Sequence, residues 1–395
     1  MTLIADVGGA VGSIVVAFIG AALLSLILTP LVRRVVLRYK IVDRPDARRV
    51  NVVPVPRSGG LAVSAAFLLV ATVFLLVNGA LDLVPVPVTF KPSGAVALLL
   101  GGAVAAALGA ADDWFDLRAR WQLAGQLVLA GGAVALGIVI GFINNPLGGG
   151  VLRFDGTPFA AGFAIFWIIG MINSINWIDG LDGLSSGIAL IAAVTLGLIS
   201  LTTQVGQPLI AVLCFALAGS LLGFLRWNFH PATIFAGTSG VQFVGYTLAV
   251  LSVLGTAKVA VALLVLGVPI IDTFWIIVRR ISEGRSPFTP DRSHIHHRLL
   301  DLGLSHRQTV LVIYGICVAL AVLALILTGA TQLYAFLGVF VASGLILFLP
   351  TRGGFDRPDE LEAESYEPDV ERAAVPAGVP VPTDPEAPEP HHKAV

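Results

Sequence analysis

The sequence predicts an all-α polytopic membrane protein with about eleven transmembrane helices. Of its 395 residues, 56% are hydrophobic and only 12% are charged. Soluble domains carry about 25% charged residues, so a chain this poor in charge is suited to a lipid environment. Long apolar runs also recur along the chain, each close to the roughly 20 residues that a helix needs to cross a bilayer.

The apolar runs predict a single membrane domain over residues 1–350. Its expected spans are 11–32, 59–80, 94–111, 121–143, 159–175, 185–203, 208–225, 240–256, 258–278, 309–329 and 331–350. A count of ten or twelve is also open, because the breaks near 204–207 and 256–258 are short. A small outer hairpin is expected around VLRFDGTPF. Residues 351–395 are rich in Pro, Glu and Ala, which predicts a disordered cytoplasmic tail.

The basic residues set the orientation of these spans. With the N-terminus outside, 21 of the 24 Lys and Arg residues fall in the inner loops and the tail; the three on the outer side are Lys91, Arg153 and Lys258. Basic loops stay in the cytoplasm, so we expect a multi-pass protein of the cell inner (plasma) membrane. The net charge of −1 gives no signal for nucleic acid, and we expect no such partner.

Four polar clusters lie at the cytoplasmic ends of the spans, where ionisable residues are costly and usually functional. The first is DRPDARRVNVVPVPRSGG, residues 43–60. Its prolines hold the chain extended, and Arg57 precedes a Gly-Gly pair that opens a span. It is either an ordinary basic loop or a binding strip for phosphate groups.

The second cluster is GAADDWFDLRARWQ, residues 109–122. Asp112 and Asp113 are adjacent carboxylates, and partial burial raises the pKa of at least one of such a pair. One interpretation is a helix end paired with Arg118 and Arg120. The other is a general base or a metal-associated pair, since acidic groups at a helix C-terminus oppose the helix dipole.

The third cluster is NSINWIDGLDGLSSG, residues 173–187. On a continuing helix, Asn176, Asp179 and Asp182 would fall within a 120° arc at 100° per residue. An amide oxygen and two carboxylates on one face are hard ligands that suit Mg²⁺, or alternatively Mn²⁺. Gly180 and Gly183 weaken a helix but let a substrate approach the backbone.

The fourth cluster is PFTPDRSHIHHRLLDLG, residues 287–303. A zinc site is conceivable, but arginines flank the histidines and a fourth ligand is not evident. Arginine and histidine together are better suited to a pyrophosphate. The cluster contributes Arg292, His294, His296, His297 and Arg298. Upstream, residues 237–240 (GTSG) could cap a helix or hold a phosphate on free N–H groups.

Together these groups indicate phosphoryl transfer between a water-soluble and a lipid-borne reactant at the membrane edge. Mg²⁺ ligands and phosphate-binding cations are what that chemistry needs. A lipid transporter is a rival hypothesis, although its charges would be expected in the middle of spans. A non-catalytic protein that binds a UDP-sugar or a lipid phosphate is another.

The ordered set DRPDARR…PVPRSGG, DDWFDL, NSINWIDGLDGL, GFLRWNFHPATIFAG and DRSHIHHRLLDLGLSHRQ resembles the polyprenyl-phosphate N-acetylhexosamine-1-phosphate transferases. The match is to the branch of WecA and TagO, with the related MraY type as the alternative. The resemblance implies transfer of a sugar-1-phosphate, most often N-acetylglucosamine-1-phosphate, from a UDP-N-acetylhexosamine to undecaprenyl phosphate. It also implies release of UMP, dependence on Mg²⁺ and a cleft that faces the cytoplasm. A homodimer is compatible with the sequence but not required by it.

The resemblance also assigns roles to residues of this chain. Asp112, Asp113, Asp179 and Asp182 are similar to the family's catalytic carboxylates, and Asn176 and Asp179 to its metal ligands. The expected substrate-binding residues are Arg57, Asp116, Asn173, Thr238, Arg292, His294, His296, His297 and Arg298.

Two positions depart from the family pattern. Asn51 stands where a histidine is usual, and Thr238 stands where the family has an aspartate that resembles a direct Mg²⁺ ligand. Three explanations of Thr238 are open: Asp179 or Asp182 supplies the missing charge, the metal binds weakly and arrives with the UDP-sugar, or the activity has diverged. The first two are favoured because the other clusters are intact.

Overall fold

The computed structural model describes residues 7–43, 54–145, 150–255, 259–282, 284, 286 and 294–348. The chain divides into two units, 1–345 and 346–395, and the architecture below is that of the first. Asn51, Arg292 and the predicted tail over 351–395 lie outside the described residues.

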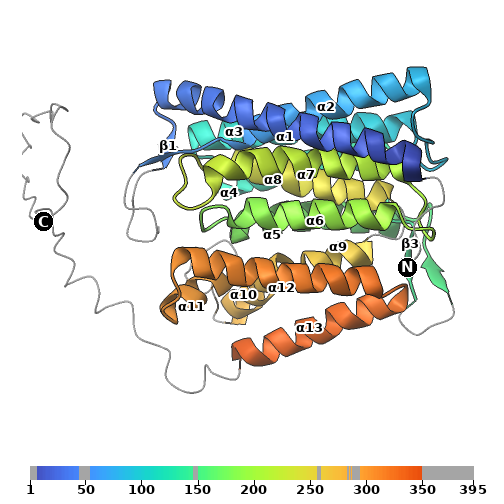
Figure 1. The fold of residues 1–395 in the computed structure, drawn as a ribbon. Helices are drawn as coiled ribbons and strands as arrows, with labels where there is room; N and C mark the ends of the chain where they lie inside the picture. The colour runs from blue at the N-terminus through green and yellow to red at the C-terminus, as the bar shows by residue number, and fades with distance from the viewer. Residues whose placement is uncertain are drawn as a thin grey trace, which may run out of the picture. The chain divides into compact units, whose positions relative to one another are not determined.

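Helices make up nearly all of the described chain (Figure 1). They are α1 (Val7–Arg38), α2 (Gly60–Leu81), α3 (Pro92–Phe115), α4 (Ala119–Ala135), α5 (Pro158–Ile178), α6 (Leu184–Ser200), α7 (Pro208–Asn228), α8 (Gly237–Leu254), α9 (Val259–Val265), α10 (Gly267–Ser282), α11 (Ile295–Asp301), α12 (His306–Ile326) and α13 (Ala330–Phe348). Two antiparallel hairpins join them: β1 (Val42–Asp43) pairs with β2 (Val55–Pro56), and β3 (Phe142–Asn144) pairs with β4 (Val151–Arg153).

The helices confirm the membrane class. Within the described residues, seven helices are long and apolar enough to cross a bilayer, namely α1, α2, α3, α5, α7, α8 and α12. Helix α6 and the stretch 330–344 of α13 are shorter apolar helices. The protein is therefore a multi-pass membrane protein.

Two predicted spans differ from the helices found. The span expected over 121–143 is helical only to Ala135, because Gly137 adopts a left-handed conformation with φ of +96°. The span expected over 258–278 is divided between α9 and α10 at Leu266. Pro269 lies in the first turn of α10, where the missing N–H is tolerated but where a continuous helix would be interrupted. The hairpin expected around VLRFDGTPF is confirmed as β3–β4.

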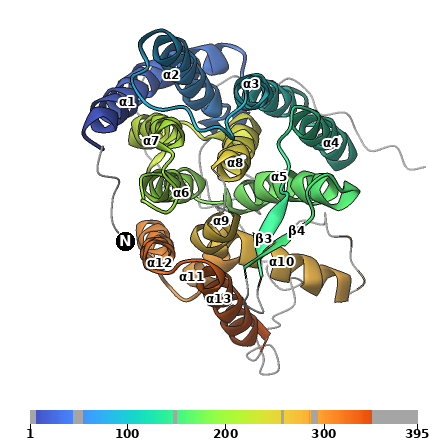
Figure 2. The ribbon, with the colours of Figure 1, turned by 90° about the vertical axis from the view of Figure 1, so that its right-hand side faces the viewer.

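Helix α8 occupies the middle of the bundle. Seen along the helices, it is surrounded by α2, α3, α5, α6 and α7 (Figure 2). Tyr246 and Phe243 of α8 are fully buried, and the Tyr246 hydroxyl donates a hydrogen bond of 2.7 Å to the Ala97 carbonyl of α3. Most of α7 and α8 is enclosed by other helices, whereas much of α1 remains on the outside.

One end of the bundle gathers the polar clusters. Helices α1, α3, α5, α7 and α10 end there, and α2, α4, α6, α8 and α12 begin there, near β1 and α11 (Figure 1). Arg38, Arg226, Arg279 and Arg280 lie in the last turns of helices that finish at this end. The contacts described below join the four clusters here, which agrees with the convergence expected from the sequence.

Two glycines allow the helix ends to approach closely. A Cβ on Gly60 would lie 1.9 Å from the Gly240 Cα, so α2 and α8 can touch only without side chains here. The Gly60 N–H donates to the Ala236 carbonyl at 2.8 Å. Gly237 has φ of +69°, and a Cβ there would lie within 2.8 Å of both Asp113 carboxylate oxygens. This packing brings Asp113 of α3 against the beginning of α8.

Candidate active site

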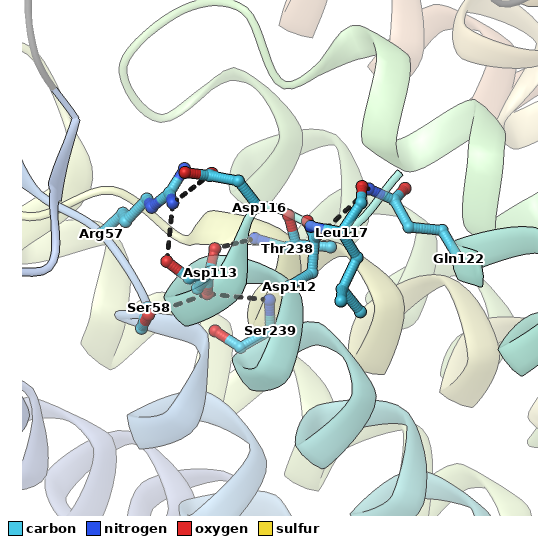
Figure 3. Close-up of polar contacts among 9 residues, drawn as sticks. All are labelled: Arg57, Ser58, Asp112, Asp113, Asp116, Leu117, Gln122, Thr238 and Ser239. Carbon is cyan, nitrogen blue, oxygen red and sulfur yellow. Dashed lines mark hydrogen bonds and ion pairs between the residues drawn. The ribbon is translucent and has the colours of Figure 1, made fainter. Parts of the chain in front are cut away.

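Asp113 joins three helix ends (Figure 3). Its Oδ1 accepts a hydrogen bond from the Thr238 N–H at 2.8 Å. Its Oδ2 accepts one from the Ser239 N–H at 3.1 Å and another from the Ser58 hydroxyl at 2.8 Å. The carboxylate thus caps α8 from a neighbouring helix, where the helix dipole favours negative charge. The N–H groups of Thr238 and Ser239, considered above as phosphate ligands, are already occupied by Asp113.

Asp112 has a different environment from its neighbour. Its Oδ1 accepts hydrogen bonds from the Leu117 N–H at 3.0 Å and from the Gln122 side chain at 2.7 Å. The structure describes no hydrogen bond to Asp112 Oδ2 within the residues it covers. The adjacent carboxylates therefore point to different partners. Among the described residues, Asp112 has one carboxylate oxygen without a hydrogen bond, whereas both oxygens of Asp113 accept hydrogen bonds.

Arg57 lies beside this acidic pair. Its Nη2 donates to the Asp113 carbonyl and to Asp116 Oδ1, both at 2.6 Å (Figure 3). The Asp116 side chain is 81% exposed, so this ion pair lies at the surface. Arg57 links the loop before α2 to the end of α3, while Nε is buried without a hydrogen-bond partner in the described residues.

The turn between α5 and α6 holds the third cluster, and here the helical arc expected from the sequence is wrong. Helix α5 ends at Ile178, so only Asn176 is helical; Asp179 follows the last turn and Asp182 lies in the next. Gly183, with φ of +78°, allows the chain to turn into α6. The cluster is therefore a compact turn and not one face of a helix.

Asn173 and Asn176 differ in their contacts. The Asn173 amide donates to the Gln126 side chain of α4 and to the Ile169 carbonyl, both at 2.8 Å. In this arrangement it joins α5 to α4. Asn176 is partly buried, and its side chain has no hydrogen bond to another residue in the part of the chain that the structure describes. Its amide oxygen remains available for a ligand.

Asp179 is the most perturbed acid of this turn. Its Oδ1 accepts a hydrogen bond of 2.5 Å from the Ser185 hydroxyl at the start of α6. Burial raises the pKa of Asp179 from 3.8 to about 6 despite that hydrogen bond, and the negative charges of Asp113 and Asp182 contribute to the rise. Asp179 is therefore close enough to Asp113 and to Asp182 for repulsion, which a bound cation would relieve.

Asp182 forms hydrogen bonds with residues that the sequence analysis did not single out. Its Oδ2 lies 2.7 Å from His230 Nδ1 and accepts the Ala232 N–H at 3.0 Å. Its own N–H donates to His306 Nε2 at 2.9 Å. The ligand atoms of Asp182, His230 and His306 lie within 4.8 Å of one another, which is compatible with a metal ion. The same three residues are already joined by hydrogen bonds through Asp182 Oδ2, His230 Nδ1 and His306 Nε2, so the cluster is also explained as a hydrogen-bonded network.

The histidines of the fourth cluster line the start of α11. His294 Nδ1 lies 2.7 Å from Asp272 Oδ2 of α10, a carboxylate that the sequence analysis missed. His296 is 1% exposed, and burial together with the neighbouring histidines lowers its pKa to about 2, so this ring is neutral. A Cβ on Gly180 would lie 2.3 Å from His296 Nε2, which places this ring against the α5–α6 turn. His297 and Arg298 are partly buried.

The donor set fits a hard divalent cation near Asp179. Oxygen ligands dominate magnesium sites, and the Asn176 amide and the Asp179 carboxylate offer oxygen atoms of this kind. The pKa of Asp179 is raised mainly because the carboxyl group is buried, and the nearby carboxylates of Asp113 and Asp182 add a smaller rise. Thr238 is held beside Asp113 by its backbone, but it offers a neutral hydroxyl where an acid would be a stronger ligand.

Comparison with known proteins identifies the family. The profile of glycosyl transferase family 4 matches residues 95–256. A probable undecaprenyl-phosphate N-acetylglucosaminyl 1-phosphate transferase of Bacillus subtilis is 38% identical over 342 residues, which cover 85% of this chain and 90% of that protein. The chain belongs to glycosyl transferase family 4.

Other relatives agree with this assignment. A decaprenyl-phosphate N-acetylglucosaminephosphotransferase of Mycobacterium leprae is 36% identical over 84% of this chain and 88% of its own length. An undecaprenyl-phosphate alpha-N-acetylglucosaminyl 1-phosphate transferase of Yersinia pestis is 28% identical over 74% of this chain and 78% of its own. These relatives place the chain in the WecA/TagO-like branch of the family, as the sequence motifs indicated.

Replacement of Asp113 should affect stability more than replacement of Asp112. In Asp113→Asn, an amide group would face N–H donors of α8, leaving a buried group unsatisfied at a cost of about 1–3 kcal/mol. We expect a lower thermal unfolding temperature in detergent for Asp113→Asn than for Asp112→Asn. Asp116→Asn, at the exposed end of the same helix, is the control and should unfold near the wild-type temperature. Equal stability of all three variants would contradict the capping role.

Asp179→Asn should stabilise the protein at neutral pH. The folded-state pKa is raised, so folding retains a proton between pH 3.8 and about 6, and wild-type stability falls as pH rises through that window. The amide carries no charge and keeps an acceptor for Ser185. We expect a gain of about 1 kcal/mol at pH 8 after allowance for solvent screening. The gain should vanish near pH 4 in thermal unfolding experiments; a stability deficit at pH 8 would contradict the repulsion described here.

Proposed function

We propose that this protein transfers a sugar-1-phosphate, most specifically N-acetylglucosamine-1-phosphate, from a UDP-sugar to undecaprenyl phosphate and releases UMP. The support is the 38% identity to a relative that bears this activity in its name, over 90% of that relative's length. Names of this kind recur among the relatives, which favours this function over the MraY-type alternative. The reaction forms a lipid-linked sugar at the start of a cell-envelope polysaccharide pathway.

The reaction is a direct displacement at phosphorus in this proposal. A phosphate oxygen of the lipid attacks the β-phosphorus of the UDP-sugar and forms the new P–O bond. The bond from that phosphorus to the bridging oxygen breaks, and the bridging oxygen leaves with UMP. A phosphate dianion is already nucleophilic, so the protein's main tasks are to position both phosphates and to balance their charge.

Asn176 and Asp179 would hold Mg²⁺, or Mn²⁺ in its place. When bound, the ion neutralises negative charge on the pyrophosphate. Asp112 is the member of the acidic pair with a free oxygen, and we assign it to the lipid phosphate. Asp113 positions α8, and Asp182 positions the loop before α8 through His230 and Ala232. Asn173 is assigned to the packing of α5 against α4, through its hydrogen bond to Gln126. The residues that we still assign to substrate binding are Arg57, Asp116, Thr238, His294, His296, His297 and Arg298.

The site is proposed to open as a cleft toward the cytoplasm at the inner membrane. Support comes from the arginine-rich helix ends that surround it, since basic residues mark the cytoplasmic side. The aromatic side chains of Tyr39, Trp114 and Trp121 are exposed at the same end. Amphipathic rings favour the membrane–water boundary, where a lipid phosphate would be found.

The function is tested by UMP release from purified protein with undecaprenyl phosphate, Mg²⁺ and a panel of UDP-sugars. We expect release with UDP-N-acetylglucosamine to exceed release with the other sugars. Release only with UDP-MurNAc-pentapeptide would support the MraY type. Absence of UMP with every sugar would overturn the transferase; lipid movement without UMP would then indicate a transporter, and UDP-sugar binding alone a non-catalytic homologue.

Thr238→Asp should lower the Mg²⁺ concentration needed for half-maximal UMP release, by about tenfold. The variant adds a carboxylate at the beginning of α8, where the helix dipole also favours it. Thr238→Asn, which is neutral and of similar size, is the matched control and should behave like the wild type. An unchanged or higher Mg²⁺ requirement in Thr238→Asp would place the metal away from this position.

A further inference from the structure

A buried carboxylate of α10 holds the first histidine of the HIHH stretch. Asp272 Oδ2 lies 2.7 Å from His294 Nδ1, and Asp272 Oδ1 accepts the Ile295 N–H at 2.9 Å. The side chains are only 6% and 10% exposed. One carboxylate therefore makes the first backbone contact of α11 and orients the ring that precedes it.

The hydrogen bond determines which nitrogen of His294 remains for a ligand. The Asp272 carboxylate accepts a hydrogen bond from Nδ1–H, so Nε2 is the nitrogen that remains for a ligand. The structure describes no hydrogen bond to Nε2 within the residues it covers. To donate from Nε2 to a phosphate oxygen while Nδ1 donates to Asp272, the ring must carry both protons and a positive charge. Burying such a charge is costly unless an anion compensates it, and Asp272 is that anion.

The histidine held in this way connects to the turn that contains the metal ligands. The rings of His294 and His296 stack with centroids 5.4 Å apart. His296 in turn lies against Gly180, between Asp179 and Asp182. A displacement of His294 would therefore be transmitted to the α5–α6 turn through one intervening ring.

We propose that Asp272 is a positioning residue that makes His294 a cationic hydrogen-bond donor to a phosphate group of the nucleotide-sugar. This inference rests on the proposed function, because it assigns a part of that site. Asp272 does not touch the substrate. It fixes the Nδ1 proton and compensates the charge, so that Nε2–H is presented to a phosphate oxygen.

Asp272→Asn separates this role from simple capping of α11. In this variant the side-chain oxygen can still accept a hydrogen bond from the Ile295 N–H, so α11 keeps its first contact. The Asn NH₂ group, however, can only donate to His294 Nδ1, which forces the ring to be neutral with its single proton on Nε2. Asp272→Ala removes both interactions and reports on the structural contribution.

The experiment measures kcat and KM for UDP-N-acetylglucosamine, together with thermal unfolding in detergent. The samples are the wild type, Asp272→Asn, Asp272→Ala, His294→Gln and the double variant Asp272→Asn/His294→Gln. Asp301→Asn, an exposed carboxylate at the other end of α11, is the matched control. We expect kcat/KM to fall about 10–100-fold in Asp272→Asn, mainly through KM, with its unfolding temperature unchanged. The double variant should be no worse than His294→Gln, because both changes act on the same interaction: Asp272→Asn removes its positive charge and His294→Gln removes the imidazole donor.

Two results would overturn the inference. One is wild-type kinetics in Asp272→Asn alongside instability of Asp272→Ala, which would show that Asp272 only caps α11. The other is losses that multiply in the double variant, which would show that Asp272 acts independently of His294. Loss of UMP release in every sample, including the wild type and Asp301→Asn, would instead overturn the proposed function, so the two failures are distinguishable.

Discussion

The geometry of the site depends on the carboxylate of Asp113 being held at the beginning of α8. This side chain accepts hydrogen bonds from two backbone N–H groups and from Ser58, and it is only 2% exposed. Hydrogen bonds to charged groups contribute about 1.5–3 kcal/mol each, and here they join α3 to both α2 and α8. The position of Thr238, the path of the loop before α2 and the contact of Arg57 with α3 all follow from that junction.

Around this junction the polar residues of the candidate site lie on turns and helix ends. Asp179 and Asp182 follow α5, His230 follows α7, and His294 precedes α11. Helix ends can present side chains to water while the helix bodies remain in lipid, where irregular backbone is costly. Hydrogen bonds between turns fix the conformation of these segments. Asp182 is hydrogen-bonded to His230, and Arg307 donates a hydrogen bond to the His230 carbonyl at 3.1 Å. The site is thus held together by polar contacts among loops.

Much of this arrangement could be predicted from the sequence. Length, apolar runs and the arginine distribution were sufficient for the membrane class and for the convergence of the clusters at one end. The ordered motifs were sufficient for the family. The arc of Asn176, Asp179 and Asp182 was wrong because helical periodicity cannot indicate where a helix ends, and α5 ends at Ile178. Asp272 was missed because it lies inside an apolar run, and only tertiary packing brings it to His294.

The two carboxylates of the acidic pair illustrate the same limit. Sequence treats Asp112 and Asp113 alike, and their difference comes from the direction of each side chain on α3. One turns toward Gln122 and the other toward α8.

The central position of α8 has a consequence for how the protein enters the membrane. Among the seven candidate spans of the described chain, α8 is the least apolar, and it includes Gln242, Thr247 and Ser252. These side chains are acceptable because neighbouring helices, and not lipid, surround them. A newly made α8 would partition weakly into a bilayer by itself. Its insertion therefore depends on helices made before it, so α8 is retained by assembly with its neighbours more than by its own hydrophobicity.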